Sequence, residues 1–178
     1  MIDLGKVTLR AFEPADVEHL YRFRNDWQVI QYLGGFSSGY SRKNLQEWIK
    51  AHRNRDDEVL WAISEKKTGR CIGHVGLYKI DPRVRKAEFA IVIGDQKWWG
   101  KGVGCSATIA MIDWGFDQLN LHKISLSVLA GNRRAIKLYE KLGFRREGAL
   151  RDEQFRDRKY VDVVLMSVLD DEWRAAHL

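Results

Sequence analysis

The chain has 178 residues, of which 45% are hydrophobic and seven are tryptophan. This is enough apolar surface for one core, and we predict a single domain over residues 1–178. No apolar run reaches the ~20 residues that span a bilayer and no leader-like segment opens the chain, so we expect a cytoplasmic protein without membrane contact. The net charge of +6 suits anionic ligands, but the mixed signs of the charged residues argue against direct nucleic-acid binding.

Cysteine and histidine residues give no sign of a metal site. Cys71 and Cys105 fall in different predicted elements, and the five histidines are scattered along the chain. We therefore expect reduced thiols and no bound metal.

The first half of the chain combines two helices with several strands. Residues 7–12 have a strand pattern, and Pro14 suits the first turn of a following helix. A glycine-rich break at 34–39 precedes a second helix, for which Ser41 is the expected N-cap. Three consecutive strands are then predicted at 59–64, 70–80 and 87–93, as an antiparallel meander.

The second half begins with a helix whose apolar face includes Val103, Ala107 and Met111. A strand at 123–129 follows, and then a short helix at 132–142 that Gly143 ends. Two closing strands are predicted at 144–151 and 160–169. The combination predicts an α+β protein.

Three glycines stand between the strand at 87–93 and the next helix. Gly100, Gly102 and Gly104 alternate with other residues there. Without side chains in the way, the N–H groups at the helix N-terminus can surround a phosphate, and the helix dipole adds positive potential. Glycines cost backbone entropy, so a purely structural turn is the weaker interpretation. The spacing predicts a site for a phosphorylated small molecule.

Two common phosphate motifs do not fit this loop. A Walker-type loop has Ser or Thr after Gly-Lys, whereas Gly102 follows Lys101 here. A Rossmann fingerprint belongs to a parallel βαβ unit, whereas this loop follows hairpin-like strands. Nucleotide hydrolysis and dinucleotide binding are therefore disfavoured.

The loop resembles the phosphate loop of the GNAT superfamily of acyl-CoA-dependent N-acetyltransferases, Q/R-x-x-G-x-G/A, although Trp99 stands at its first position. Further stretches are similar to the branch that contains ribosomal-protein alanine acetyltransferases and spermidine acetyltransferase: 9–10, 24–26, 121–124, 132–144 and 148–152. The resemblance covers nearly the whole chain. It implies a GNAT-like fold, with a mixed, mostly antiparallel sheet of about seven strands and helices on both faces. It also implies transfer of an acetyl group from acetyl-CoA to a primary amine in a ternary complex.

The same resemblance implies where acetyl-CoA binds. Its pyrophosphate would meet the N–H groups of the loop, and its pantetheine arm would lie where the strand at 87–93 splays from a parallel strand at 123–129. The implied binding residues are Ile91, Val92, Ile93, Trp99, Gly100, Lys101, Gly102, Val103, Gly104, Cys105, Asn132, Ala135 and Tyr139. Asn132 also suits a helix N-cap, and the two roles are compatible.

Transfer requires a neutral amine, a tolerated oxyanion and a proton for the departing thiolate. The resemblance implies that the Tyr139 hydroxyl lies near the sulfur as the acid, and packing in the core is the alternative role for this residue. Glu88 is the first candidate for the base and His74 the second; the structural alternatives are a solvated carboxylate and a core histidine. A backbone N–H near Val92 is the expected oxyanion donor.

The acceptor pocket is implied to lie between residues 24–40 and 151–160. Its expected lining residues are Arg24, Asn25, Trp27, Tyr32 and Trp48, and His74 is a further expected substrate contact. Acidic and basic residues alternate in the second region, which suits an acceptor with its own negative charge, or a protein N-terminus, better than a polyamine. Amino sugars, polyamines, amino acids and protein N-termini all stay open as acceptors.

Two other classes of protein stay open as well. An acyl-CoA-binding or sensing module would keep the cofactor site without efficient catalysis, although the presence of Tyr139 argues against it. An enzyme docked on a ribosome would use its basic surface to reach a protein N-terminus. A homodimer is compatible with the sequence.

Overall fold

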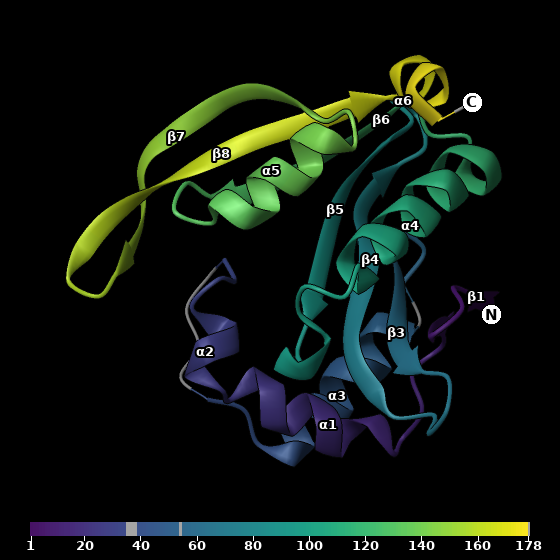
Figure 1. Cartoon of the computed structure of the whole chain (residues 1–178), viewed down its shortest axis with the longest axis vertical. Helices are drawn as coiled ribbons and strands as arrows, with labels where there is room; N and C mark the ends of the chain where they lie inside the picture. Colours follow the sequence, from purple (N-terminus) through teal and green to yellow (C-terminus); the bar gives the residue numbers. More distant parts are fainter. Residues whose placement is uncertain (35–38, 54, 178) are drawn as a thin grey trace.

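The computed structural model describes residues 1–34, 39–53 and 55–177. Within these residues one sheet has the strand order β1-β2-β3-β4-β5-β6-β8-β7 (Figure 1). The parallel pair is β5–β6, and the other pairs are antiparallel. The strands are β1 (Ile2–Asp3), β2 (Val7–Arg10), β3 (Val59–Glu65), β4 (Cys71–Asp81), β5 (Lys86–Ile93), β6 (Lys123–Leu129), β7 (Arg145–Arg156) and β8 (Lys159–Leu169). The predicted α+β class and mixed sheet are confirmed, and the two-residue β1 adds an eighth strand at one edge.

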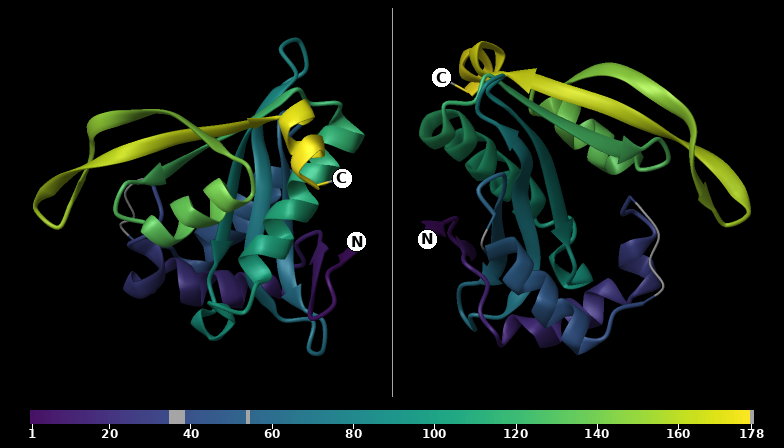
Figure 2. Two further views of the ribbon diagram at one scale, coloured as in Figure 1. Left: turned by 45° about the horizontal axis from the view of Figure 1, so that its top comes forward. Right: turned by 180° about the vertical axis from the view of Figure 1, so that it is seen from behind.

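Helices cover both faces of the sheet (Figures 1 and 2). They are α1 (Asp16–Arg24), α2 (Trp27–Ile30), α3 (Arg42–Arg53), α4 (Val103–Leu119), α5 (Arg133–Lys141) and α6 (Asp170–His177). On one face, Leu20 of α1 and Leu45 of α3 share a buried cluster with Ala62 of β3. On the other face, Met111 of α4 shares a second cluster with Ile124 of β6. None of the described helices is long and apolar enough to cross a membrane.

The predicted strands and helices are present with shifted ends, and four further elements were not predicted: β1, α2, α6 and a 3₁₀ helix at Gln96–Trp98. β1 and α2 are too short for a periodic pattern, and α2 begins where the Asp26 side chain accepts from the N–H of Gln28. α6 is held by a tertiary contact, in which the Trp173 indole donates to Asp113 of α4 at 2.7 Å. The glycine-rich break at 34–39 falls largely on residues 35–38, which lie outside the described residues.

β5 and β6 pair only where they begin. The aligned residues run from Lys86 with Lys123 to Glu88 with Ser125. β6 instead pairs with β8 along its whole length, from Lys123 to Leu129. The two parallel strands therefore diverge, as the views in Figure 2 show. We call the edges that face each other beyond this pairing, 89–93 of β5 and 126–129 of β6, the wedge.

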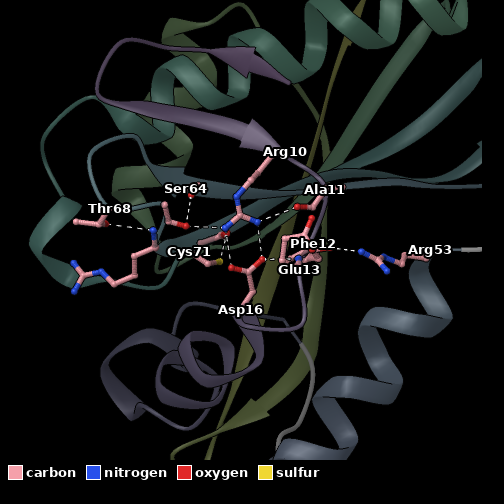
Figure 3. A network of polar contacts seen from close by, with 12 residues as sticks. Arg10, Ala11, Phe12, Glu13, Asp16, Arg53, Ser64, Thr68 and Cys71 are labelled. Carbon is pink, nitrogen blue, oxygen red and sulfur yellow. Dashed lines mark hydrogen bonds and ion pairs between the residues drawn. The ribbon is translucent and has the colours of Figure 1, made fainter.

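An ion pair with little exposure attaches α1 to the sheet (Figure 3). Arg10 of β2 donates to both carboxylate oxygens of Asp16, at 2.7 and 2.8 Å, and this contact raises the pKa of Arg10. Arg10 also donates to the carbonyl of Gly69, in the turn between β3 and β4, at 2.8 Å. Asp16 in turn accepts from the N–H of Glu13. The network fixes the position of α1 and thereby of Arg24 at its C-terminal end.

Candidate active site

The first turn of α4 presents backbone N–H groups without an intramolecular cap. Gly102 stands at the N-cap position in the left-handed conformation and offers no side chain to the helix. The N–H of Ser106 reaches back to the Gly102 carbonyl at 3.0 Å. Helix geometry leaves the N–H groups before this one without helical acceptors. Those of Val103, Gly104 and Cys105 are thus suited to an anion.

Two of the three loop glycines are required by their backbone conformation. The angle φ is +77° at Gly100 and +82° at Gly102, where other L residues are strained. Gly104 is helical, and a Cβ there would lie 4.0 Å from both Ile93 and Leu138. Gly104 therefore keeps the helix close to β5 and α5 without being required by its dihedral angles.

Arg134 of α5 is a neighbour of this loop that sequence reasoning missed. A Cβ built on Gly100 would lie 3.7 Å from its guanidinium. Lys101, by contrast, directs its ammonium to the Trp98 ring, 5.5 Å from the ring centre. The position of Arg134 two residues after the predicted cap Asn132 was the signal available in the sequence. An exposed cation next to free N–H groups is the arrangement that a pyrophosphate needs.

Trp99 has a different role from the polar residue that the family motif has at this position. Its indole N–H donates to the carbonyl of Ile93 at 2.8 Å. The ring also packs edge-on against Tyr32, with centroids 6.1 Å apart. Trp99 therefore holds the end of β5 in place, and Ile93, whose carbonyl accepts this bond, stays a predicted contact of the pantetheine arm.

The backbone of β5 alternates between its two neighbours. The Ile93 carbonyl points away from β4, and by the two-residue period of a strand the N–H and carbonyl of Ile91 point the same way, into the wedge. The Val92 carbonyl lies against β4, where a Cβ on Gly73 would come within 2.1 Å of it. The Val92 backbone therefore faces β4, whereas the Ile91 backbone faces the wedge and fits the predicted oxyanion donor, a backbone N–H near Val92.

Tyr139 lies just beyond the point at which β5 and β6 separate. Its ring packs edge-on against Phe89, the first β5 residue after the paired segment, with centroids 6.2 Å apart. Burial raises the pKa of Tyr139 to about 12. Among the described residues no group hydrogen-bonds to its hydroxyl. A buried phenol without a partner is available to donate to a ligand atom.

The start of α5 borders the same region. The Asn132 side chain accepts from the N–H of Ala135 at 3.2 Å, so its expected role as the N-cap is confirmed. Its amide nitrogen is not used in this cap and can still donate to a ligand. Ala135, partly buried beside the core, places no bulk near the arm.

Glu88 lies on the opposite side of β5 from Tyr139. Consecutive strand residues point to opposite faces, and Tyr139 packs on Phe89. The Glu88 carboxylate is half exposed and accepts from Lys79 at 3.0 Å, a surface ion pair that holds it only weakly. An acid on one face and a carboxylate on the other therefore flank the same point of the wedge.

His74 is a core residue, which corrects its prediction as a base and as a substrate contact. It is 3% exposed, and its Nε2 lies 3.0 Å from a terminal nitrogen of Arg24. Burial first, and then the Arg24 charge, lower its pKa well below the usual value, so the imidazole is neutral. Because Arg24 can only donate, Nε2 is the acceptor in this contact.

Asn25 is likewise a structural residue. Its amide nitrogen donates to the carbonyls of Tyr21 and Tyr40, at 2.9 and 3.0 Å, and its oxygen accepts from the Tyr40 N–H at 2.8 Å. Both amide hydrogens are therefore used within the chain, and Asn25, whose surface is exposed, stays a predicted lining residue of the acceptor pocket. The contacts set the position of Tyr40 beside Arg24.

Two of the predicted acceptor residues are exposed near α2. Trp27 and Tyr32 have 54% and 46% of their surface accessible. The guanidinium of Arg156, near the tip of the β7–β8 hairpin, donates to the carbonyls of Ile30 and Leu33. The hairpin thereby reaches the region of α2 that sequence reasoning had assigned to the acceptor pocket.

The fold and this geometry define a class of protein. A mixed sheet with one diverging parallel pair, an uncapped glycine-rich helix N-terminus and a buried tyrosine at the divergence match the GNAT acetyltransferases. Residues 6–145 match the model of the acetyltransferase (GNAT) domain. The chain belongs to this family and is an acetyl-CoA-dependent N-acetyltransferase.

Named relatives extend over nearly the whole chain. It is 33% identical over 170 residues to the spermidine N(1)-acetyltransferase of Vibrio cholerae, which covers 95% of this chain and 96% of the relative. It is 28% identical over 171 residues to the putative ribosomal N-acetyltransferase YdaF of Bacillus subtilis, covering 94% and 93%. The crystal structure of the Vibrio cholerae spermidine N-acetyltransferase in complex with CoA and spermine superposes with a TM-score of 0.85, at 31% identity, over 96% of this chain and 99% of that one.

Proposed function

We propose that the chain moves the acetyl group of acetyl-CoA directly to the primary amine of a small molecule. The observation that carries this proposal is the wedge: free backbone lines it, the uncapped start of α4 lies beyond one end and the Tyr139 hydroxyl lies at the other. These features match the three parts of acetyl-CoA, a pyrophosphate, an arm with amide groups and a thioester.

The cofactor would be held largely by main chain. The N–H groups of Val103, Gly104 and Cys105, with Arg134 beside them, suit the pyrophosphate. The backbone of Ile91 suits the amides of the arm, in the manner of an added strand. Acetyl-CoA supplies the acetyl group as a thioester.

Tyr139 and Glu88 would handle the protons. The Tyr139 hydroxyl, neutral because burial raises its pKa, holds a proton for the sulfur as the carbon–sulfur bond breaks. Glu88, on the other face of β5, takes a proton from the attacking amine, directly or through a water molecule. The proton lost by the nitrogen and the proton gained by the sulfur balance the transfer.

The relatives' names point to two classes of acceptor. Spermidine is a polyamine, and the putative ribosomal enzyme implies a protein N-terminus. Open, partly aromatic surface at Trp27 and Tyr32 suits a small molecule. An acyl-CoA-sensing module is less well supported, because sensing has no use for the unpartnered Tyr139 hydroxyl.

The test follows release of the CoA thiol from acetyl-CoA in the presence of polyamines, amino sugars, amino acids and peptides with free N-termini. Acceptor-dependent release, with the acetylated product identified by mass, would support the proposal. Tight binding of acetyl-CoA without release on any of these acceptors would contradict it and favour a sensing module. Turnover of peptides alone would move the acceptor from small molecules to protein N-termini.

A further inference from the structure

Arg24, at the C-terminal end of α1, is a partly buried cation in an uncharged environment. Its guanidinium lies 4.9 Å from the ring centre of Trp48 and 5.6 Å from that of Tyr40. Its hydrogen bond goes to the neutral imidazole of His74. Its Nε atom is buried and without a hydrogen-bond partner. The dipole of α1 favours a cation at this helix end but provides no hydrogen-bond acceptor for the unpartnered Nε.

No carboxylate of the described residues forms an ion pair with Arg24. Residues 35–38, Gly-Phe-Ser-Ser, which lie outside the described residues, carry no acidic side chain. Glu58, just before β3, lies 3.6 Å from Arg55, although its Oε1 is buried without a hydrogen-bond partner, and Glu88 of β5 lies 3.0 Å from Lys79. A guanidinium withdrawn from water is normally paired with an anion, and here the chain does not provide one.

Arg24 lies on the face of the sheet that carries Glu88, the candidate base. His74 lies opposite Val92, and Tyr78 lies opposite Glu88, so both side chains share the face of the sheet that Glu88 occupies. The Tyr78 hydroxyl also lacks a hydrogen-bond partner within the described part of the chain, and Arg24 acts on it electrostatically. At about 3.3 Å per residue, the level of His74 and Val92 lies roughly 10 Å along β5 from Phe89, the first residue beyond the pairing with β6.

We propose that Arg24 binds an anionic group of the acceptor, so that the preferred substrate is a primary amine carrying a carboxylate or a phosphate several ångströms from the nitrogen. The inference rests on the proposed acetyltransferase function and names its substrate class. A planar guanidinium that stacks on Trp48 and is steadied by His74 has its orientation fixed before the ligand arrives, which suits bidentate binding of such an anion. The same cation disfavours a polyamine, whose ammonium groups it would repel.

The test compares matched acceptors that differ in the anion: glucosamine 6-phosphate with glucosamine, and lysine with cadaverine, with spermidine as the polycation. We expect kcat/KM to be about 10- to 100-fold higher for the anionic member of at least one pair. The phosphate and carboxylate pairs distinguish the two kinds of anion. In Arg24→Gln this preference should be lost, mainly through a higher KM for the anionic acceptor.

Arg22→Gln is the matched control, because Arg22 lies on the same helix with an exposed side chain beside Glu18, and it should keep the wild-type preference. Acetyl-CoA affinity measured on each variant reports whether it is folded. A wild-type preference for spermidine, or an equal loss for anionic and uncharged acceptors in Arg24→Gln, would overturn this inference and leave the acetyltransferase function intact. Absence of turnover with every amine in the wild type would overturn both.

Discussion

The cofactor side and the acceptor side of this protein are built in different ways. At the cofactor side the proposed binding groups are main-chain N–H groups of the α4 first turn and the free edge of β5, exposed by glycines in conformations that other residues avoid. At the acceptor side the proposed binding groups are side chains, including Arg24 and Glu88, held by aromatic rings and hydrogen bonds.

The difference teaches where specificity resides. Main-chain groups depend on backbone shape, so they recognise a constant ligand and tolerate many sequences. Side chains carry charges that attract or repel the substrate, so substitution of a single residue can alter which amine is preferred. A common cofactor with divergent acceptors follows from this division, and variants on either side should separate the two properties.

The largest effect should come from closing the cofactor side. Gly102→Glu forces a side chain into the left-handed conformation and brings a carboxylate to the place that a pyrophosphate would occupy. We expect acetyl-CoA affinity to fall by more than about 100-fold, measured by titration calorimetry. Gly102→Ala adds the backbone strain without the charge, and there is open space for its Cβ. This variant should therefore lose much less acetyl-CoA affinity than Gly102→Glu. Equal losses in both variants would indicate that backbone strain alone governs the site.

Loss of the buried Arg10–Asp16 ion pair in Figure 3 should affect the acceptor side more than the cofactor side. Asp16→Asn leaves the Arg10 guanidinium without its anion, and breaking such a pair costs about 3 kcal/mol of unfolding free energy. Urea unfolding measures that loss. At urea concentrations too low to unfold the variant, its KM for the acceptor should be higher than that of the wild type, while its acetyl-CoA affinity stays at the wild-type value. A weakened acetyl-CoA site would show that the two sides are not independent.

Tyr139→Phe tests chemistry at the point where the two sides meet. Removing the hydroxyl deletes the proposed acid but keeps the ring contact with Phe89. We expect kcat to fall about 100-fold, as is common for the loss of a general acid, with acetyl-CoA affinity unchanged. Stopped assays with product quantification give kcat, and calorimetry gives the affinity. An unchanged kcat would leave Tyr139 with a packing role alone.

The smallest effect concerns the pH dependence of stability. Burial raises the pKa of Tyr139 on the cofactor side and of Cys71 on the acceptor side, each to about 12, so the unfolded chain loses these protons at lower pH than the folded one. Their contribution to stability is complete below about pH 8 and is lost as pH rises toward 12, by up to about 1.4 kcal/mol per pH unit for each group. Unfolding followed at pH 8, 9 and 10 measures the slope. Cys71→Ala should reduce it, and an unchanged slope in that variant would contradict the assignment to Cys71.

The sequence predicted most of the fold because its signals are local. Glycines and N-caps mark helix ends, and apolar periodicity marks the buried faces; Ser41, for example, accepts from the Asn44 N–H as expected for a cap. The same signals located the phosphate loop and Asn132. The short α2 and β1 were missed because a few residues carry no period.

The direction of individual groups required the tertiary structure. No sequence pattern shows that Val92 turns its carbonyl to β4, that Trp99 occupies the carbonyl of Ile93, or that His74 is buried under Arg24. Arg134 reaches the phosphate loop from α5, a contact between residues distant along the chain.

By itself, the sequence determined the family and predicted the acetyl-CoA site and the candidate acid Tyr139, because these depend on residues at fixed local spacings. Only the tertiary structure decided that Arg24 lacks an anion and that Glu88 and Tyr139 lie on opposite faces of β5. Charge pairing and the facing of side chains depend on which distant elements pack together. Packing of that kind arises from the whole chain, so a single stretch of sequence does not encode it.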